Sequence, residues 1–187
     1  MYQENLQYGT KRKVERRPEK PLLSMVFDWS IESSLPELPR NCAYIPAYSS
    51  YIRVTLGSFS WEFKEVEQIF KASMTDVKIV KIDRMQNPVR WKNYQRKKNY
   101  MKKMAHGNEQ MVNEKRLFHG TSPDAVNGIC EESFDCRLSG KNGTSYGKGS
   151  YFAVKASLSH GYAGVDTDLT RSMFFAKVLV GVIIVAY

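Results

Sequence analysis

The chain has 187 residues, of which 42% are hydrophobic and 12% aromatic, so it can fill one ordinary domain with a tail but not two full domains. Its formal net charge of +9, from 28 Lys and Arg against 19 Asp and Glu, favours polyanionic partners, although a solvated basic surface explains it more simply.

The three cysteines, Cys42, Cys130 and Cys136, form no CxxC pair and have no histidine at ligand spacing. This argues against a disulfide scaffold and a zinc site, and we expect no metal. The polar N-terminus lacks the apolar core of a secretory signal, which predicts a location in the nucleus and/or the cytoplasm.

The first 50 residues show little regular patterning. Residues 1 to 21 contain the basic run GTKRKVERRP, which fits a localisation signal, a nucleic-acid arm or a plain charged strand. Residues 22 to 50 are rich in proline and serine, and the prolines interrupt every candidate helix, so we expect an irregular linker. The apolar residues 25 to 29 indicate that part of this linker packs on the domain that follows.

Regular patterns begin after residue 58. Apolar residues at helical spacing predict an amphipathic helix over residues 61 to 74, and a β-branched run predicts a strand over residues 77 to 84. Asn87 and Pro88 then begin a second helix, which we expect to run to about Met104. One side of that helix is basic, most simply as a solvated face, but it is also the best candidate for docking a nucleic acid or a substrate. The cations on that side are Lys92, Arg96, Lys97, Lys98, Lys102 and Lys103.

The second half of the chain mixes strands and short helices. Residues 115 to 121 are predicted to form a strand, and Ser122 is placed to cap a helix that begins at Pro123. A glycine-rich loop over residues 140 to 149 leads into a strand that holds Tyr151, and residues 157 to 162 are expected to be helical.

Residues 173 to 187 are apolar almost throughout, but a membrane helix needs ~20 such residues. We therefore expect a buried strand or strand pair and no membrane partner. Strands and helices do not alternate regularly, and no glycine fingerprint joins a strand to a helix, which disfavours a Rossmann domain and predicts an α+β fold.

Two motifs carry the functional information. The first is Leu117-Phe118-His119-Gly120-Thr121, and the second is Tyr146-Gly147-Lys148-Gly149-Ser150-Tyr151-Phe152-Ala153. They combine an imidazole, a glycine that lets a ligand approach the backbone, and a tyrosine on a glycine-punctuated strand. Together, in this order, they resemble the nicotinamide-binding core of the poly(ADP-ribose) polymerase (PARP) family, the ADP-ribosyltransferases that consume NAD.

The resemblance covers roughly residues 50 to 181 and implies the fold and the domain organisation. Residues 51 to 187 are expected to form an incomplete PARP catalytic fold, α+β, with a split antiparallel sheet and flanking helices. Residues 1 to 21 look like the remnant of the C-terminus of a WWE domain, and residues 22 to 50 are then the linker between the two.

The resemblance also implies roles for five residues in binding NAD. The matching histidine of the family, here His119, binds the adenosine ribose hydroxyl, and Gly120 would pin the nicotinamide carboxamide through its backbone. The other three are Tyr151, packed on the nicotinamide and its ribose, Ser159, whose hydroxyl would meet the carboxamide oxygen, and Tyr162, which would sandwich the nicotinamide ring. His119 and Tyr151 are the candidate catalytic residues, and NAD is expected as the substrate. Without the resemblance, His119 could equally be a core histidine whose hydrogen bonds are satisfied within the protein, and Tyr151 a core tyrosine.

The family places a third signature residue on a later strand. That residue is a glutamate in polymer-forming members and usually an apolar residue in members that transfer single units. The sequence departs from the family pattern after Gly181, so no residue of this chain can be assigned the third role, and we expect a C-terminally truncated catalytic domain.

Three functions are compatible with these motifs. The first is an NAD-dependent protein ADP-ribosyltransferase that transfers ADP-ribose, in single units, to protein side chains and releases nicotinamide. The second is an inactive fragment that binds NAD weakly or acts as an interaction or RNA-associated module, with nucleic acid or poly(ADP-ribose) bound through the basic surface. The third is a stable α+β domain with no ligand.

Overall fold

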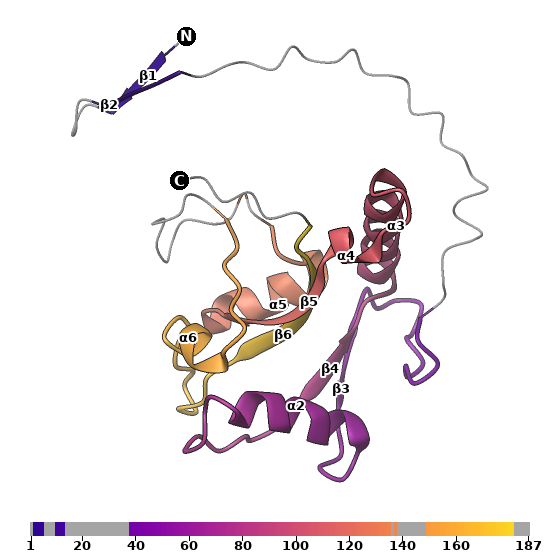
Figure 1. Cartoon of the computed structure of the whole chain (residues 1–187). Helices are drawn as coiled ribbons and strands as arrows, with labels where there is room; N and C mark the ends of the chain where they lie inside the picture. The colour runs from indigo at the N-terminus through magenta and orange to yellow at the C-terminus, as the bar shows by residue number, and fades with distance from the viewer. Residues whose placement is uncertain (1, 6–9, 14–37, 136, 138–148, 182–187) are drawn as a thin grey trace. The chain divides into compact units, whose positions relative to one another are not determined.

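The computed structural model describes residues 2–5, 10–13, 38–135, 137 and 149–181 (Figure 1). The chain divides into two compact units, Met1–Ser34 and Leu35–Tyr187. In the first unit, β1 (Tyr2–Asn5) pairs with β2 (Thr10–Lys13) as an antiparallel hairpin, with Tyr2 opposite Lys13. The basic run predicted within residues 1 to 21 therefore includes a strand. None of the helices in the described ranges is long and apolar enough to span a bilayer.

The larger unit begins with a strand pair and a helix. β3 (Ile52–Thr55) pairs antiparallel with β4 (Asp83–Gln86), and α2 (Trp61–Lys71) lies between them in the sequence. The Ser60 side chain accepts a hydrogen bond from the Phe63 amide at 3.2 Å and so caps the start of α2. The helix predicted over residues 61 to 74 is confirmed, although it ends three residues earlier.

The strand predicted over residues 77 to 84 is wrong for most of its length, because β4 starts only at Asp83. The Lys71 ammonium donates to the carbonyls of Thr75 at 2.9 Å and Val77 at 2.5 Å, so those carbonyls are bonded without a partner strand. Backbone pairing with the β3 side begins at Ile82, whose carbonyl accepts from the Leu56 amide at 2.9 Å. A β-branched run becomes a strand only where another strand can pair with it.

The long basic helix is observed as predicted. α3 (Pro88–Met104) has Asn87 as its N-cap and proline in its first turn, and a short helix, α4 (Glu109–Val112), follows it. Sequence periodicity did not predict α4, since one turn of helix is too short to show a repeat.

The central pair of the larger unit is β5 (Glu114–Gly120) with β6 (Met173–Leu179), which run antiparallel. Phe118 lies opposite Phe175, and their rings stack at 4.6 Å between centroids. The Phe118 ring also meets Phe70 of α2 edge-on at 6.3 Å, and Phe118 is only 2% exposed. His119 points to the opposite face of the pair because side chains alternate along a strand. The core therefore lies on the Phe118 face, and His119 faces the candidate site.

Two helices complete the unit, α5 (Pro123–Glu132) and α6 (Ala156–His160). Ser122 precedes α5 as predicted, but its side chain makes no capping bond. The strand predicted around Tyr151 is absent; only Ala153 bridges to Phe118, because the chain turns into α6 directly afterwards. The helix predicted over residues 157 to 162 is confirmed in its first part as α6.

The predicted fold class is confirmed: the described strands pair antiparallel in three separate two-stranded sheets, and helices lie between them in the sequence. The strand predicted over residues 173 to 187 is confirmed to Leu179, while residues 182–187 lie outside the described residues. Most of the predicted glycine-rich loop, residues 140–148, and Cys136 also lie outside them.

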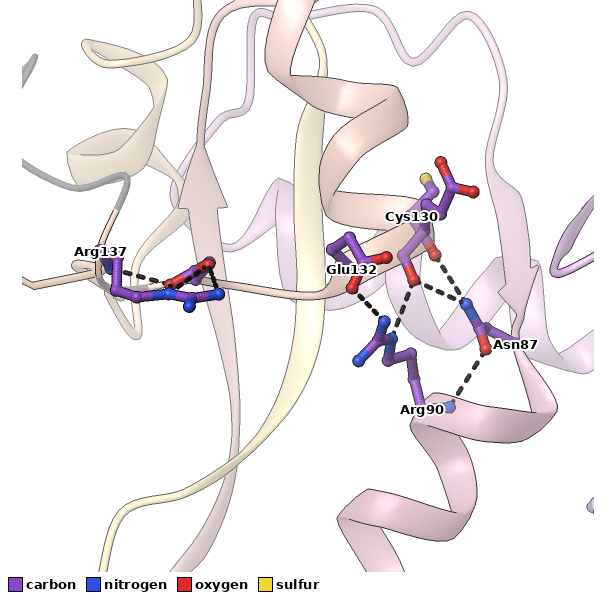
Figure 2. A network of polar contacts seen from close by, with 7 residues as sticks. Asn87, Arg90, Cys130, Glu132 and Arg137 are labelled. Atoms are coloured by element: carbon purple, nitrogen blue, oxygen red, sulfur yellow. Dashed lines mark hydrogen bonds and ion pairs between the residues drawn. The ribbon is translucent and has the colours of Figure 1, made fainter.

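A polar junction ties the start of α3 to the end of α5 (Figure 2). The Asn87 amide nitrogen donates to the carbonyls of Cys130 and Glu131, both at 3.1 Å, while its oxygen accepts from the Arg90 amide at 3.1 Å. Arg90 donates to the Glu131 carbonyl at 2.9 Å and forms an ion pair with Glu132. One buried side chain thus caps α3 and bonds the last carbonyls of α5.

Candidate functional site

His119 is held in a defined orientation near the C-terminal end of β5. Its Nδ1 lies 2.8 Å from the Tyr151 carbonyl oxygen. A carbonyl can only accept, so Nδ1 carries the proton and, in the neutral ring, Nε2 is an acceptor. The ring therefore presents Nε2 as the atom available to a ligand hydroxyl group.

Two phenylalanines pack against the His119 ring, and a third packs against one of them. The Phe134 ring meets it edge-on at 4.9 Å between centroids, and Phe152 lies at 5.3 Å. Phe134 also packs edge-on against Phe152 at 4.8 Å and Phe174 at 5.7 Å. These rings fix the imidazole plane and give it a largely apolar surrounding, which strengthens any hydrogen bond made there.

Sequence reasoning missed this aromatic cluster. Phe134, Phe152 and Phe174 come from three separate segments, and the β5–β6 register, with His119 opposite Phe174, brings Phe174 into this cluster, where it packs on Phe134. Phe174 could have been found only by pairing the two strands, which places it opposite His119.

Gly120 lets α6 approach β5 as closely as backbones can. A Cβ atom at this position would lie 1.9 Å from the Ser159 carbonyl oxygen and 2.9 Å from the Ala163 nitrogen. Van der Waals contact forbids both distances, so any side chain would push α6 away. The sequence explained this glycine by the approach of a ligand, and the structure adds a second requirement, the packing of α6.

Ser159 lies at this contact and is 4% exposed. Its hydroxyl donates to the Phe118 carbonyl at 3.0 Å, which ties α6 to the strand that carries His119. The predicted contact of this hydroxyl with a carboxamide oxygen requires its proton to turn away from Phe118, whereas the oxygen can accept from a ligand amide as it stands.

The two tyrosines of the predicted site keep substantial contact with solvent. Tyr151 is 41% exposed and Tyr162 is 58% exposed. Tyr151 is placed by its carbonyl bond to His119, and Tyr162 by a 3.1 Å bond from its amide to the Ser159 carbonyl. Exposed rings next to an ordered imidazole offer surfaces on which a planar ligand can stack.

A series of contacts thus links the five predicted residues. His119 contacts Tyr151, Gly120 contacts Ser159, and Ser159 bonds to Tyr162, so β5, the segment before α6 and α6 itself meet at one place. Within the described part of the chain, no group of three or more His, Cys, Asp or Glu side chains is arranged to hold a metal ion. The site presents an imidazole, a serine oxygen, peptide groups and tyrosine rings, which suit a neutral amide, an aromatic ring and sugar hydroxyls.

Comparison with known proteins points to one family. Residues 60–186 match the family model described as the poly(ADP-ribose) polymerase catalytic domain. The chain is 40% identical to human protein mono-ADP-ribosyltransferase PARP12 over 187 residues, 96% of this chain and 26% of that protein. It is 34% identical to mouse protein mono-ADP-ribosyltransferase PARP11 over 200 residues, 97% of this chain and 59% of that protein. The chain thus spans about a quarter of the length of the PARP12 relatives, 26% in both human and mouse.

Proposed function

The chain belongs to the poly(ADP-ribose) polymerase family through its catalytic domain, and we propose that it is an NAD-dependent protein ADP-ribosyltransferase that transfers single ADP-ribose units. The relatives PARP12 and PARP11 are named protein mono-ADP-ribosyltransferases, which supports transfer of single units. In this reaction a nucleophilic side chain of an acceptor protein attacks the anomeric carbon of the nicotinamide ribose. The carbon–nitrogen bond to nicotinamide breaks, and the ring leaves as neutral nicotinamide.

The observation that carries this proposal is the oriented His119. Its Nδ1 is committed to the Tyr151 carbonyl at 2.8 Å, so Nε2 can accept from the adenosine ribose hydroxyl of NAD. A hydrogen-bond partner that is fixed before the ligand arrives contributes to rate because no reorganisation is needed as the reaction proceeds.

The other four residues would hold the nicotinamide end. We assign the carboxamide to Gly120 and to Ser159, whose oxygen is an available acceptor for the carboxamide NH₂ while its proton bonds Phe118. Tyr151 and Tyr162 would stack on the nicotinamide ring and its ribose, and each such contact is worth about 0.5 to 1.5 kcal/mol beyond simple burial.

The partners proposed for this function are NAD and protein acceptor side chains. A location in the nucleus and/or the cytoplasm, and the WWE origin of residues 1 to 21, remain predictions from the sequence. A nucleic acid or poly(ADP-ribose), predicted from the net charge of +9, would meet the basic helix α3 and not the His119 site.

Labelling of the chain, or of an added acceptor protein, with biotinylated NAD tests the proposal. The wild-type chain is expected to transfer label, and His119→Ala is expected to lower the rate about 100-fold, because the ribose loses a pre-oriented hydrogen-bond partner. Tyr151→Ala is expected to lower the rate about tenfold, because the stacking surface is lost while the backbone carbonyl that orients His119 stays in place.

His160→Ala is the matched control, since this second histidine lies beside Ser159 on α6 but has no place in the proposed site. Its labelling should equal that of the wild type. Circular dichroism melts check that each variant is folded. A folded wild-type chain that carries no label on any acceptor would sink the transferase proposal and favour the NAD-binding module.

A further inference from the structure

Helix α3 is the most strongly charged element of the described chain. Its 17 residues include seven Lys and Arg and no Asp or Glu. Neighbouring elements neutralise three of these cations: Glu132 pairs with Arg90, Glu114 with Lys98 and Glu109 with Lys102. The helix itself contributes no acidic side chain to offset its positive charge.

Three of the seven cations form a stripe along one side of α3. Lys92, Arg96 and Lys103 are separated by four and seven residues, so they lie on one face of a helix with 3.6 residues per turn. Lys92 and Lys103 are exposed, and neither makes an ion pair with any residue that the structure describes. At ~1.5 Å per residue the stripe is about 16 Å long, which spans several phosphates of a nucleic-acid strand.

An apolar groove lies beside the stripe, between α3, α4 and Gly181, which is two residues past the end of β6. Its volume is about 210 Å³, and it is lined by Tyr100, Met101, Met104, Ala105, Met111 and Gly181. Tyr100 is 56% exposed, Met104 64% and Met111 46%. Lys97 lies over the Tyr100 ring at 5.3 Å, so a cation and a stacking surface occur together at the groove.

We propose that this face of α3 binds single-stranded nucleic acid. Lys92, Arg96 and Lys103 contact successive phosphates, and one unstacked base enters the groove against Tyr100. Proteins that bind single strands combine a positively charged track for the backbone with aromatic side chains on which bases stack. The methionines suit this role because their flexible thioethers adapt to either a purine or a pyrimidine.

The apolar groove favours single-stranded nucleic acid over other polyanionic ligands. A duplex keeps its bases stacked and could use only the cations of the stripe. An acidic peptide would match these cations without needing an aromatic ring. The proposal does not depend on NAD turnover, since none of its residues belongs to the His119 site.

Fluorescence anisotropy of a short labelled polyuridine RNA, titrated with the full chain at several salt concentrations, tests the proposal. For three phosphate contacts, the slope of log affinity against log salt should be about −2. Lys92→Glu with Lys103→Glu should weaken binding at least about tenfold and flatten that slope to about −0.7. Tyr100→Ala should also weaken binding about tenfold but leave the slope unchanged, whereas Tyr100→Phe should bind as the wild type does.

The matched control is Lys78→Glu with Lys155→Glu, two exposed lysines outside α3 that give the same change in net charge. This control should lose less than a third as much binding free energy as the α3 variant. Equal losses in the two double variants, an unchanged affinity in Tyr100→Ala, or tighter binding of heparin or poly(ADP-ribose) than of RNA would each overturn the proposal. Thermal melts confirm that the variants are folded, which the exposed positions of all these side chains favour.

Discussion

Gly120→Ala is expected to destabilise the larger unit by about 3 kcal/mol and to remove nicotinamide binding at the same time. The added Cβ would lie 1.9 Å from the Ser159 carbonyl oxygen and 2.9 Å from the Ala163 nitrogen, and both are backbone atoms that no side-chain rotation can move away. Helix α6 must shift to relieve the clash, and Ser159 and Tyr162 move with it. Urea unfolding monitored by circular dichroism measures the stability change.

Gly128→Ala is the matched control for this substitution. Gly128 lies inside α5, and a Cβ there would have no atom within 4 Å. Alanine is a better helix former than glycine by about 1 kcal/mol, so this variant should be slightly more stable than the wild type. The two substitutions add the same methyl group and should have opposite effects. A Gly120→Ala chain with wild-type stability would contradict the close packing of α6 on β5.

Asn87→Ala is expected to have the next largest effect, a loss of about 2 to 4 kcal/mol. Asn87 is 6% exposed, and its side chain both caps α3 and donates to the Cys130 and Glu131 carbonyls. Loss of an N-cap costs about 1 kcal/mol, and a buried carbonyl that loses its donor costs about 1 to 3 kcal/mol. Because α5 leads through Ser133 to Phe134, the packing around His119 should loosen as well.

Two further variants separate the parts of this effect. Asn87→Ser retains a capping oxygen and loses the donor to the Cys130 and Glu131 carbonyls, without placing a carboxylate against them, so it should destabilise the unit less than alanine does. Asn108→Ala removes the N-cap of the one-turn helix α4, where the Asn108 oxygen accepts from Gln110 at 3.0 Å on the surface, and should cost less than about 1 kcal/mol. Equal losses for Asn87→Ala and Asn108→Ala would show that the junction with α5 contributes nothing.

The sequence predicts the elements whose signals are local. Periodic apolar residues mark α2, and Asn87-Pro88 marks the first turn of α3, because capping and helical burial act within a few residues of the chain. The β-branched run from Val77 misled the prediction, since strand formation depends on a partner that local sequence does not encode. Tyr151 is outside any strand for the same reason.

The candidate site divides in the same way. The motif around His119 and Gly120 is visible in the sequence, and so is the pair Ser159 and Tyr162. The contact that makes Gly120 necessary is with a carbonyl of a distant helix, and the aromatic cluster that includes His119 draws its phenylalanines from three segments. Such contacts follow from the register of β5 with β6 and from the docking of α6, which only the folded structure supplies.

The proposed function requires that β5, residue 151 and α6 form a nicotinamide pocket. Thermal unfolding of the wild-type chain with increasing 3-aminobenzamide tests it most directly, because a ligand that binds only the native state must raise its stability. At a concentration about 100-fold above Kd the stabilisation is about 2.7 kcal/mol, a rise in Tm on the order of 10 °C. The rise should shrink in Tyr162→Ala and persist in Tyr48→Ala, where the tyrosine is 93% exposed and distant in sequence from the site. A cooperative transition in the wild type that does not move at saturating 3-aminobenzamide would contradict the pocket.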